Sequence, residues 1–314
     1  MKTVFLIAAY NEEAALPGMV ESFLPFWRES DARVLFVDDG SSDGTLALLQ
    51  GLAEAHPFIG YVSLSRNFGK EQAIAAGLSA LPESEGRALV VMDADGQHTL
   101  ADVRRLLARL EDDAELDLVF GVRETRDYQS VLDRAFSKGF YRLTNALAST
   151  PIDGRLGDFF VARPEILPAL RGFTDRRLFW KGIYSWIGFR RDVVPITIAD
   201  RAGGRSKFNF FRRLRLAIDG IVWMTKAPLY IFAVFGFLMS AISFIVALVF
   251  IVQFLFVGVK VPGFYTIIVL QAFIGGVIMM SLGVIALYLS VIFENTSSKP
   301  GFIISHRSDP PDWG

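Results

Sequence analysis

The fold is decided by Phe36-Val37-Asp38-Asp39-Gly40-Ser41-Ser42-Asp43-Gly44, where an apolar strand runs directly into acids and glycines. Similar short apolar runs recur along roughly the first 200 residues and alternate with stretches of helical pattern. The predicted strands are 4–9, 34–37, 61–64, 88–92 and 118–121, and the predicted helices are 15–27, 44–55, 70–80 and 101–110. This alternation predicts an α/β domain whose mostly parallel sheet is covered by helices on both faces.

Polar residues follow the predicted strands at the points where the strands end. They are Asn11-Glu12, Asp38-Asp39, Arg66-Asn67 and Asp93-Ala94-Asp95. In parallel sheets of this kind, ligands bind in the crevice outside the carboxyl ends of the strands. We therefore expect one ligand site to gather these segments.

The adjacent acids Asp38 and Asp39 are expected to emerge at the sheet edge, because carboxylates do not fit in an apolar sheet core. A carboxylate there can accept hydrogen bonds from a base N–H or from ribose hydroxyls. The simpler interpretation is a turn that caps the next helix through Ser41 or Asp43. Two neighbouring acids exceed what a cap requires, which favours nucleotide binding.

A sharper signal is Val91-Met92-Asp93-Ala94-Asp95-Gly96-Gln97-His98. Two carboxylates two residues apart at a strand end can converge on one cation if the chain turns between them. Hard oxygen ligands suit Mg²⁺ or Mn²⁺, which also take water and substrate phosphates. A solvated acidic turn is the alternative, and His98 is either a third ligand or a solvent-facing side chain.

Two further segments are more ambiguous. Ser65-Arg66-Asn67-Phe68-Gly69-Lys70 follows a strand and opens a helix, which suits either an anion site or an ordinary capped helix start. Asp158 lies between glycines and aromatic residues in 154–160. A partly desolvated carboxylate there is a candidate general base or acceptor-positioning group.

The composition excludes several functional classes. The chain has 314 residues and a formal net charge of −1, so its bulk charge indicates no nucleic-acid partner. It has no cysteine, which excludes disulfides, thiolate metal sites and cysteine nucleophiles. The apolar start at Thr3–Tyr10 is short and is followed at once by Asn11-Glu12-Glu13, so it indicates a buried strand and not a signal peptide.

Two long runs, Ala227–Val259 and Val261–Phe293, contain no charged residue. Each exceeds the ~20 apolar residues that cross a bilayer, so two transmembrane helices are predicted, with a buried pair of core helices as the alternative. Basic residues lie before the first run and after the second, at Arg212, Arg213, Arg215, Lys226, Lys299 and Arg307. This excess places the catalytic domain, the tail and therefore both termini in the cytoplasm.

The segment before the first run is predicted to be an interfacial amphipathic helix, because aromatic residues alternate there with arginines. An ordinary surface helix is the alternative. The predicted organisation is a catalytic domain at 1–207, the interfacial helix at 208–226, a two-helix transmembrane hairpin at 227–293 and a cytoplasmic tail at 294–314.

Taken together, these motifs resemble a known family. Segments 8–13, 37–45, 66–71 and 93–97 are similar to the family 2 glycosyltransferases with the GT-A fold, a Rossmann-like sheet. Within that family, segments 178–188 and 201–208 followed by two spans resemble the polyprenyl-phosphate glycosyltransferases. Bactoprenol glucosyltransferases and dolichol-phosphate mannose synthases are relatives that the chain resembles.

The resemblance implies roles for particular residues. Donor-binding positions would be Ala9, Tyr10, Asn11, Glu13, Asp39, Lys70, Asp93, Ala94, Arg201, Ser206 and Lys207. The metal, Mg²⁺ or Mn²⁺, would be held by Asp93, Asp95 and Gln97. Asp158 would be the catalytic aspartate, with Asp95 beside it, and the acceptor phosphate would be held by Arg123, Arg134 and Lys138.

The implied reaction is an inverting transfer of a hexose, with glucose as the first choice, from a UDP-sugar to undecaprenyl phosphate. It would take place at the cytoplasmic face of the inner membrane, in a homo-oligomer for which relatives suggest a tetramer. This chain has Phe160 where close relatives often have arginine, and His98 where they often have aspartate. These two differences bear on which substrate is used more than on the type of reaction. Three alternatives remain: a membrane-anchored transferase with a glycan or soluble acceptor, a sugar-nucleotide sensor without turnover, and a small channel. The predicted spans contain no ionisable residue that could line a path for ions, which argues against the channel.

Overall fold

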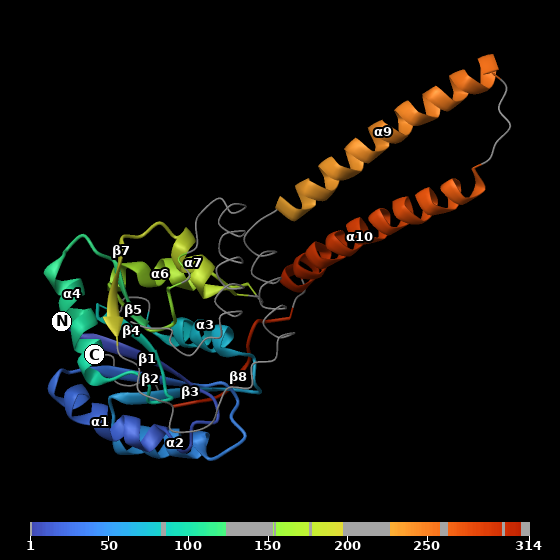
Figure 1. Cartoon of the computed structure of the whole chain (residues 1–314). Helices are drawn as coiled ribbons and strands as arrows, with labels where there is room; N and C mark the ends of the chain where they lie inside the picture. The colour runs from blue at the N-terminus through green and yellow to red at the C-terminus, as the bar shows by residue number, and fades with distance from the viewer. Residues whose placement is uncertain are drawn as a thin grey trace.

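A mixed sheet of eight strands forms the centre of the structure, a computed structural model that describes residues 2–82, 86–123, 153, 155–175, 178–196, 227–257, 263–296 and 299–308 (Figure 1). The strand order is β7-β5-β6-β4-β1-β2-β3-β8. The strands are β1 (Thr3–Ala9), β2 (Arg33–Asp38), β3 (Ile59–Leu64), β4 (Ala88–Asp93), β5 (Leu118–Arg123), β6 (Phe160–Ala162), β7 (Arg191–Ile196) and β8 (Ile304–Arg307).

The helices connect these strands. They are α1 (Leu16–Glu29), α2 (Thr45–Ala55), α3 (Lys70–Ala80), α4 (Leu100–Asp112), the short η1 (Pro164–Ile166), α6 (Leu167–Arg171), α7 (Trp180–Trp186), α9 (Ala227–Val257) and α10 (Phe264–Thr296). All the predicted strands and helices of the first 121 residues are therefore confirmed, with ends that shift by only a few residues.

The middle of the sheet is parallel. β4, β1, β2 and β3 lie side by side in one direction, so their carboxyl ends form one edge. The chain first builds outward from β1 to β3 and then returns to place β4 on the other side of β1. That reversal is the topological switch point at which such sheets bind ligands. The antiparallel strands are β6, between β4 and β5, and β8, beside β3.

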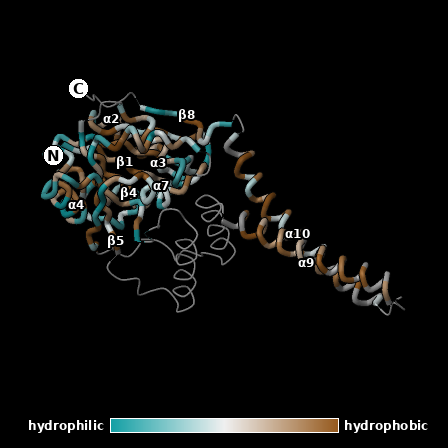
Figure 2. The backbone as a smooth tube through the Cα atoms, turned by 90° about the horizontal axis from the view of Figure 1, so that it is seen from above, coloured by the Kyte–Doolittle hydropathy of each residue, from teal (hydrophilic) through white to brown (hydrophobic). Residues whose placement is uncertain are grey.

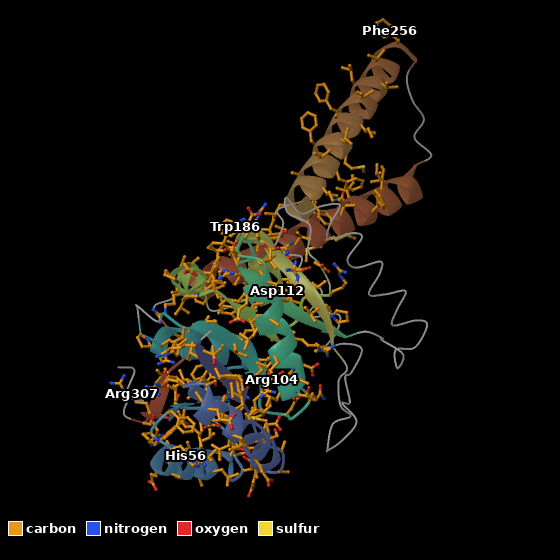
Figure 3. The ribbon with its side chains drawn as sticks, turned by 90° about the vertical axis from the view of Figure 1, so that its left-hand side faces the viewer. His56, Arg104, Asp112, Trp186, Phe256 and Arg307 are labelled. Atoms are coloured by element: carbon orange, nitrogen blue, oxygen red, sulfur yellow. The ribbon has the colours of Figure 1, made fainter. Side chains whose placement is uncertain are left out.

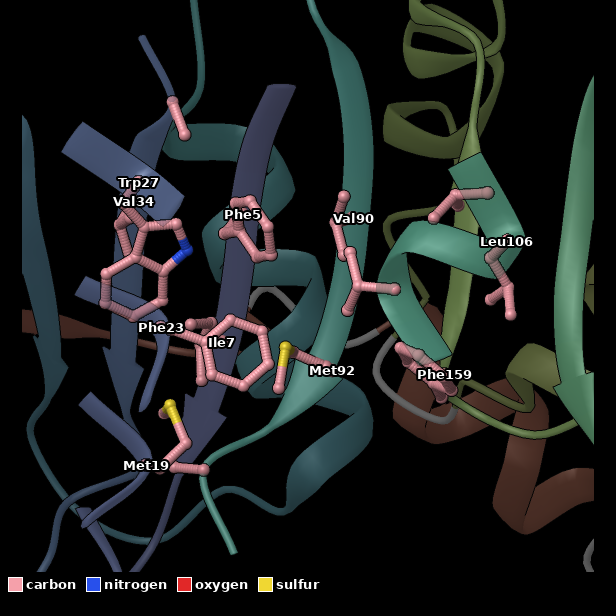
Figure 4. Close-up of a cluster of buried hydrophobic side chains, with 14 of the residues drawn as sticks. Phe5, Ile7, Met19, Phe23, Trp27, Val34, Val90, Met92, Leu106 and Phe159 are labelled. Atoms are coloured by element: carbon pink, nitrogen blue, oxygen red, sulfur yellow. The ribbon is translucent and has the colours of Figure 1, made fainter. Parts of the chain in front are cut away.

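Each face of the sheet carries its own apolar core, because successive side chains of a strand point to opposite faces. On β1, Phe5 and Ile7 pack with α1 and α4, as Figure 4 shows. Val4 and Leu6 pack on the other face with α3, α6 and α7. Burial on both faces explains the nearly continuous apolar character of the central strands.

The sequence did not indicate β6, β7 and β8. β6 has only three residues, and β7 contains Pro195, which is tolerated because β7 is an edge strand. β8 was assigned to the cytoplasmic tail, but it pairs with the edge of β3 and so belongs to the sheet of the catalytic domain. The α/β fold class is confirmed, with a mixed sheet that is parallel from β4 through β1 and β2 to β3.

Two long helices, α9 and α10, extend away from this domain and contact each other (Figures 1 and 2). Figure 2 shows that both are hydrophobic along most of their length, and Phe256 lies at the distant end of α9 in Figure 3. Within the described residues, one stretch, Phe273–Phe293, is long enough and, with a mean hydropathy of 2.3, apolar enough to cross a membrane, and none of it is buried. Two spanning helices are thus not confirmed, and for α9 the prediction stands untested. The predicted interfacial helix at 208–226 lies outside the described residues.

Candidate active site

The loops after β1 and β2 are joined to each other by reciprocal hydrogen bonds. Asn11, which adopts a left-handed conformation with φ 55°, donates its backbone N–H to the Ser41 hydroxyl at 2.9 Å and accepts the Ser42 N–H at 2.8 Å. The Glu13 carboxylate accepts the Gly44 N–H at 2.9 Å. Asn11 and Glu13, predicted to bind the donor, therefore shape the two loops at the sheet edge.

The two acids that end β2 hold the next loop in place. The buried Asp38 carboxylate accepts the Ser63 hydroxyl at 2.7 Å. The buried Asp39 carboxylate accepts the backbone N–H groups of Phe68 and Gly69, at 2.7 and 2.9 Å, one on each oxygen. Burial raises the pKa of Asp39 even though these hydrogen bonds favour its charged form. Each oxygen keeps a second lone pair with which a nucleotide could still be bound.

Gly40 lets the β2 turn approach the loop after β3. Its φ is +66°, and a Cβ at this position would lie 2.3 Å from the Arg66 carbonyl carbon. Any other residue would push the two loops apart, because backbone atoms cannot move aside as a flexible side chain can. The neighbouring Ala9 is buried, whereas Tyr10 is 45% exposed at the same edge and presents its ring to solvent.

The centre of the site is a lysine between two acids. The Lys70 ammonium at the start of α3 lies 2.7 Å from Asp93 and 2.8 Å from Asp158. Burial alone would lower the pKa of Lys70, but the two carboxylates outweigh it and raise this pKa above its ordinary value. Burial raises the pKa of Asp93, and Lys70 only partly offsets this effect. The structure thus joins three residues that the sequence had placed in three separate segments.

The turn after β4 presents the second acid of the predicted metal motif. Gly96 has φ +71°, which reverses the chain so that the Gln97 N–H donates to the Asp95 carboxylate at 3.1 Å. Ala94 is buried and donates its N–H to the Ala8 carbonyl at 3.0 Å. A capping box between Thr99 and Asp102, which the sequence analysis missed, then starts α4.

The donor set fits a cation that draws further ligands from a substrate. Across the parts of the chain that the structure describes, no three His, Cys, Asp or Glu side chains gather to hold a metal by themselves. The charges of Asp95 and Asp158 are close enough to raise the pKa of Asp93, so three acids share one region. Such a site suits Mg²⁺ or Mn²⁺, which keep waters and substrate phosphates as ligands.

Aromatic contacts position Asp158. The ring of the next residue, Phe159, stacks on His98 with the centroids 4.1 Å apart. It also covers Gly121, where a Cβ would lie 2.4 Å from the ring. His98 is thus a half-buried stacking partner of Phe159, an outcome that neither interpretation of the sequence foresaw. Phe160 is a fully buried residue of β6, so a core position explains why this chain lacks a charged residue there.

Sequence reasoning missed Glu71 and Tyr184 as members of the site. Burial and the Asp158 carboxylate raise the pKa of Glu71 to about 8. The Glu71 backbone carbonyl accepts the Trp180 indole N–H at 3.0 Å, which ties α3 to α7. The Tyr184 hydroxyl is buried near Glu71 and Asp158, and burial raises its pKa well above the ordinary value. The local sequence offered one signal for Glu71, its position directly after Lys70, and none for Tyr184.

For several predicted site residues the structure describes no side chain. Arg123 is the last residue of β5, and its side chain is not described. The other basic residues assigned to the acceptor phosphate or the mobile loop lie outside the described residues, namely Arg134, Lys138, Arg201, Ser206 and Lys207.

Comparison with known proteins identifies the family. The model described as "Glycosyl transferase family 2" matches residues 4–171. The SfII prophage-derived bactoprenol glucosyl transferase of Shigella flexneri is 32% identical over 314 residues, which cover 99% of this chain and 100% of that protein. The prophage bactoprenol glucosyl transferase homolog of Escherichia coli (strain K12) is 30% identical over 306 residues, which cover 97% of this chain and 98% of that protein.

A solved structure also matches part of the chain. A mannosyltransferase from Pyrobaculum calidifontis in complex with GDP-Man and Mn²⁺ is 21% identical, with a TM-score of 0.47, and the match covers 65% of this chain and 58% of that chain. The family model and the full-length relatives are the findings that identify the chain. It belongs to glycosyltransferase family 2 and is a glycosyltransferase.

Proposed function

We propose that this protein transfers a hexose, with glucose as the first choice, from a UDP-sugar to a polyprenyl phosphate at the cytoplasmic face of a membrane. The Shigella flexneri and Escherichia coli relatives, which match along nearly the full chain, are named for bactoprenol glucosyl transfer. The observation that carries the proposal is the Lys70 ammonium between Asp93 and Asp158, at the carboxyl edge of the parallel strands. It puts a cation and a separate carboxylate where a diphosphate and an acceptor would meet.

The donor would bind across the edge of β1, β2 and β4. Tyr10 offers an exposed ring to the base, and the loops held by Asn11, Glu13 and Asp39 offer backbone groups and carboxylate lone pairs to the ribose. Asp93 and Asp95, assisted by Gln97, would hold the divalent cation. A cation there neutralises charge that builds on the diphosphate as the sugar leaves. With the donor bound, the Lys70 ammonium would exchange one of its two ion pairs for a contact with the diphosphate. Arg201, Ser206 and Lys207 are assigned to the other side of the diphosphate.

The acceptor needs little activation. A lipid phosphate is already ionised at neutral pH, so its oxygen can attack the anomeric carbon without losing a proton. The new bond forms between that oxygen and the anomeric carbon, and the diphosphate leaves with the electron pair of the old bond, which inverts the configuration. Asp158 is ion-paired with Lys70, so we assign it to orient the acceptor and the sugar near the reacting carbon. Arg123, Arg134 and Lys138 are assigned to the acceptor phosphate.

The sheet supports a hairpin topology. β7 and β8 belong to the same sheet, so residues 196 and 304 lie on the same side of any membrane. We infer that the intervening chain crosses the membrane an even number of times. With Phe273–Phe293 as one span, we assign α9 as the second. Such a hairpin would follow an interfacial helix at 208–226, and assembly into a tetramer would gather several hairpins.

The test is transfer of label to lipid. Membranes that contain the full chain are mixed with polyprenyl phosphate, Mn²⁺ and radiolabelled UDP-glucose, and label in the organic extract is counted. We expect lipid-linked label with the wild-type chain and a loss of at least about a hundredfold with Asp158→Asn or Asp93→Asn. Label that stays in the aqueous phase as a glycan would support a soluble acceptor instead. The proposal fails if no sugar nucleotide gives a lipid-linked product.

A further inference from the structure

The C-terminal residues Lys299–Ser308, here called the C-terminal strap, form the outer edge of the sheet. β8 within the strap pairs antiparallel with β3, with Val62 opposite Arg307 and Leu64 opposite Ile304. At the end of the strap, Tyr61 and Ser308 exchange two hydrogen bonds, each at 3.0 Å. These two residues are 247 positions apart, so the strap is a long-range element that no local pattern indicates.

The other end of the strap contacts the segment that leads into the active site. The Ser65 N–H donates to the Ile303 carbonyl at 2.9 Å, at the point where β3 ends. Phe302 packs against the apolar core beneath α3. Gly301 lies against the Gln72 side chain, where an added Cβ would lie 2.5 Å from the amide oxygen. Gln72 is 5% exposed and donates to the Asp175 carbonyl at 3.0 Å, so it has little room to move away.

Between these two contacts lies the donor loop, residues 65–70. Its Phe68 and Gly69 N–H groups bind Asp39, and its last residue, Lys70, reaches Asp93 and Asp158. The strap therefore holds the loop at both ends, at Ser65, its first residue, and at Gln72, just after its last residue. The strap also begins only a few residues beyond Thr296, where α10 ends.

We propose that the C-terminal strap positions the donor loop, so that the segment after the membrane helix sets the geometry of the nucleotide-sugar site. This role rests on the proposed function, because it takes the loop to be part of the donor site. Without the strap, the Ser65 N–H loses its partner and the β3 edge is open. The loop would then sample conformations in which the Phe68 and Gly69 N–H groups leave the Asp39 carboxylate, and donor binding would weaken.

Two substitutions in the full chain test the strap. Gly301→Val places a branched side chain against Gln72 and pushes the strap away, whereas Phe302→Ala only removes an apolar contact and introduces no clash. For both variants we expect the KM for UDP-glucose to rise about tenfold, while kcat at saturating donor stays within about twofold of wild type. Ser308→Ala is the matched control, because it removes a strap contact at the end away from the donor loop.

Amide hydrogen exchange gives a readout that is independent of turnover. Exchange of peptides covering residues 65–69 should become faster in Gly301→Val and Phe302→Ala and remain unchanged in Ser308→Ala. Unchanged KM and unchanged exchange in both strap variants would overturn the proposal, and so would a fall in kcat with donor affinity intact. The wild-type chain separates the two proposals. If it transfers sugar to lipid normally while the strap variants show no change, only the role of the strap is refuted. If the wild-type chain shows no transfer at all, the proposed function itself is refuted.

Discussion

At the scale of single residues, the acids at the strand ends have two roles. Asp38 and Asp39 are buried and hold the protein's own loops in place. Asp38 accepts a hydrogen bond from β3, and Asp39 accepts two from the loop after it. Asp93 and Asp158 instead share one cation, the Lys70 ammonium.

Lys70→Met tests the central ion pair. Removal of the ammonium leaves two carboxylates without a counter-charge and raises the pKa of Asp93 further. We expect kcat to fall on the order of a hundredfold, because charge on the leaving diphosphate loses its stabilisation. Lys2→Met is the control, since Lys2 also pairs with an aspartate, at 2.8 Å from Asp31, but on the surface. Equal kcat values for Lys70→Met and wild type in the lipid-extraction assay would contradict this role.

Glu71 makes a prediction about pH and stability. Its pKa is raised from 4.5 to about 8 in the folded chain, so between these pH values the folded state keeps a proton that the unfolded state has lost. This contribution makes the fold less stable as pH rises through that window. Glu71→Gln should therefore raise the thermal unfolding midpoint at pH 8 but not at pH 4.5, with a free-energy gain on the order of 2 kcal/mol.

The control for Glu71→Gln is the same substitution at an exposed glutamate. Glu54→Gln on α2 alters an exposed carboxylate and should give the same difference from wild type at both pH values. If Glu71→Gln behaves in the same way as Glu54→Gln, the Glu71 carboxyl is ionised in the folded chain at neutral pH.

At the scale of elements, the packing of α3 on the sheet depends on one glycine. A Cβ at Gly77 would lie 2.1 Å from the Leu6 Cδ1 atom and 2.8 Å from the Val37 Cγ2 atom. Gly77→Ala should lower stability by about 1–3 kcal/mol through overpacking, although alanine favours helices. Gly51→Ala on α2 has open space around it and should stabilise by up to about 1 kcal/mol. Thermal unfolding of both variants measures this, and a stabilised Gly77→Ala variant would refute the close packing.

At the scale of the whole molecule, the proposed hairpin of α9 and α10 makes a prediction about which side of the membrane each segment faces. The chain has no cysteine, so single cysteines can report position without a background. We expect Gly263→Cys, directly before α10, to react with a membrane-impermeant maleimide outside intact cells. Glu54→Cys, in the catalytic domain, should react only after the membrane is opened. Labelling of both sites from the same side would mean that α9 and α10 do not form a spanning hairpin.

The sequence by itself determined the alternation of strands and helices, the acids at the strand ends and the two long uncharged runs. These features are local, because strand and helix periods and span length are written in neighbouring residues. They were sufficient to place Asp39, Asp93 and Lys70 at one edge of a parallel sheet. The family resemblance then supplied the chemistry for those positions.

Only the tertiary structure decided which of these groups meet. The Lys70 bridge to Asp93 and Asp158, the stack of Phe159 on His98 and the pairing of β8 with β3 all join distant segments. β8 is short and exposed, so nothing in Ile304–Arg307 reveals which strand edge it covers. The physical reason is that unpaired backbone groups at a sheet edge accept any extended segment, and the choice of partner depends on where the rest of the chain delivers it.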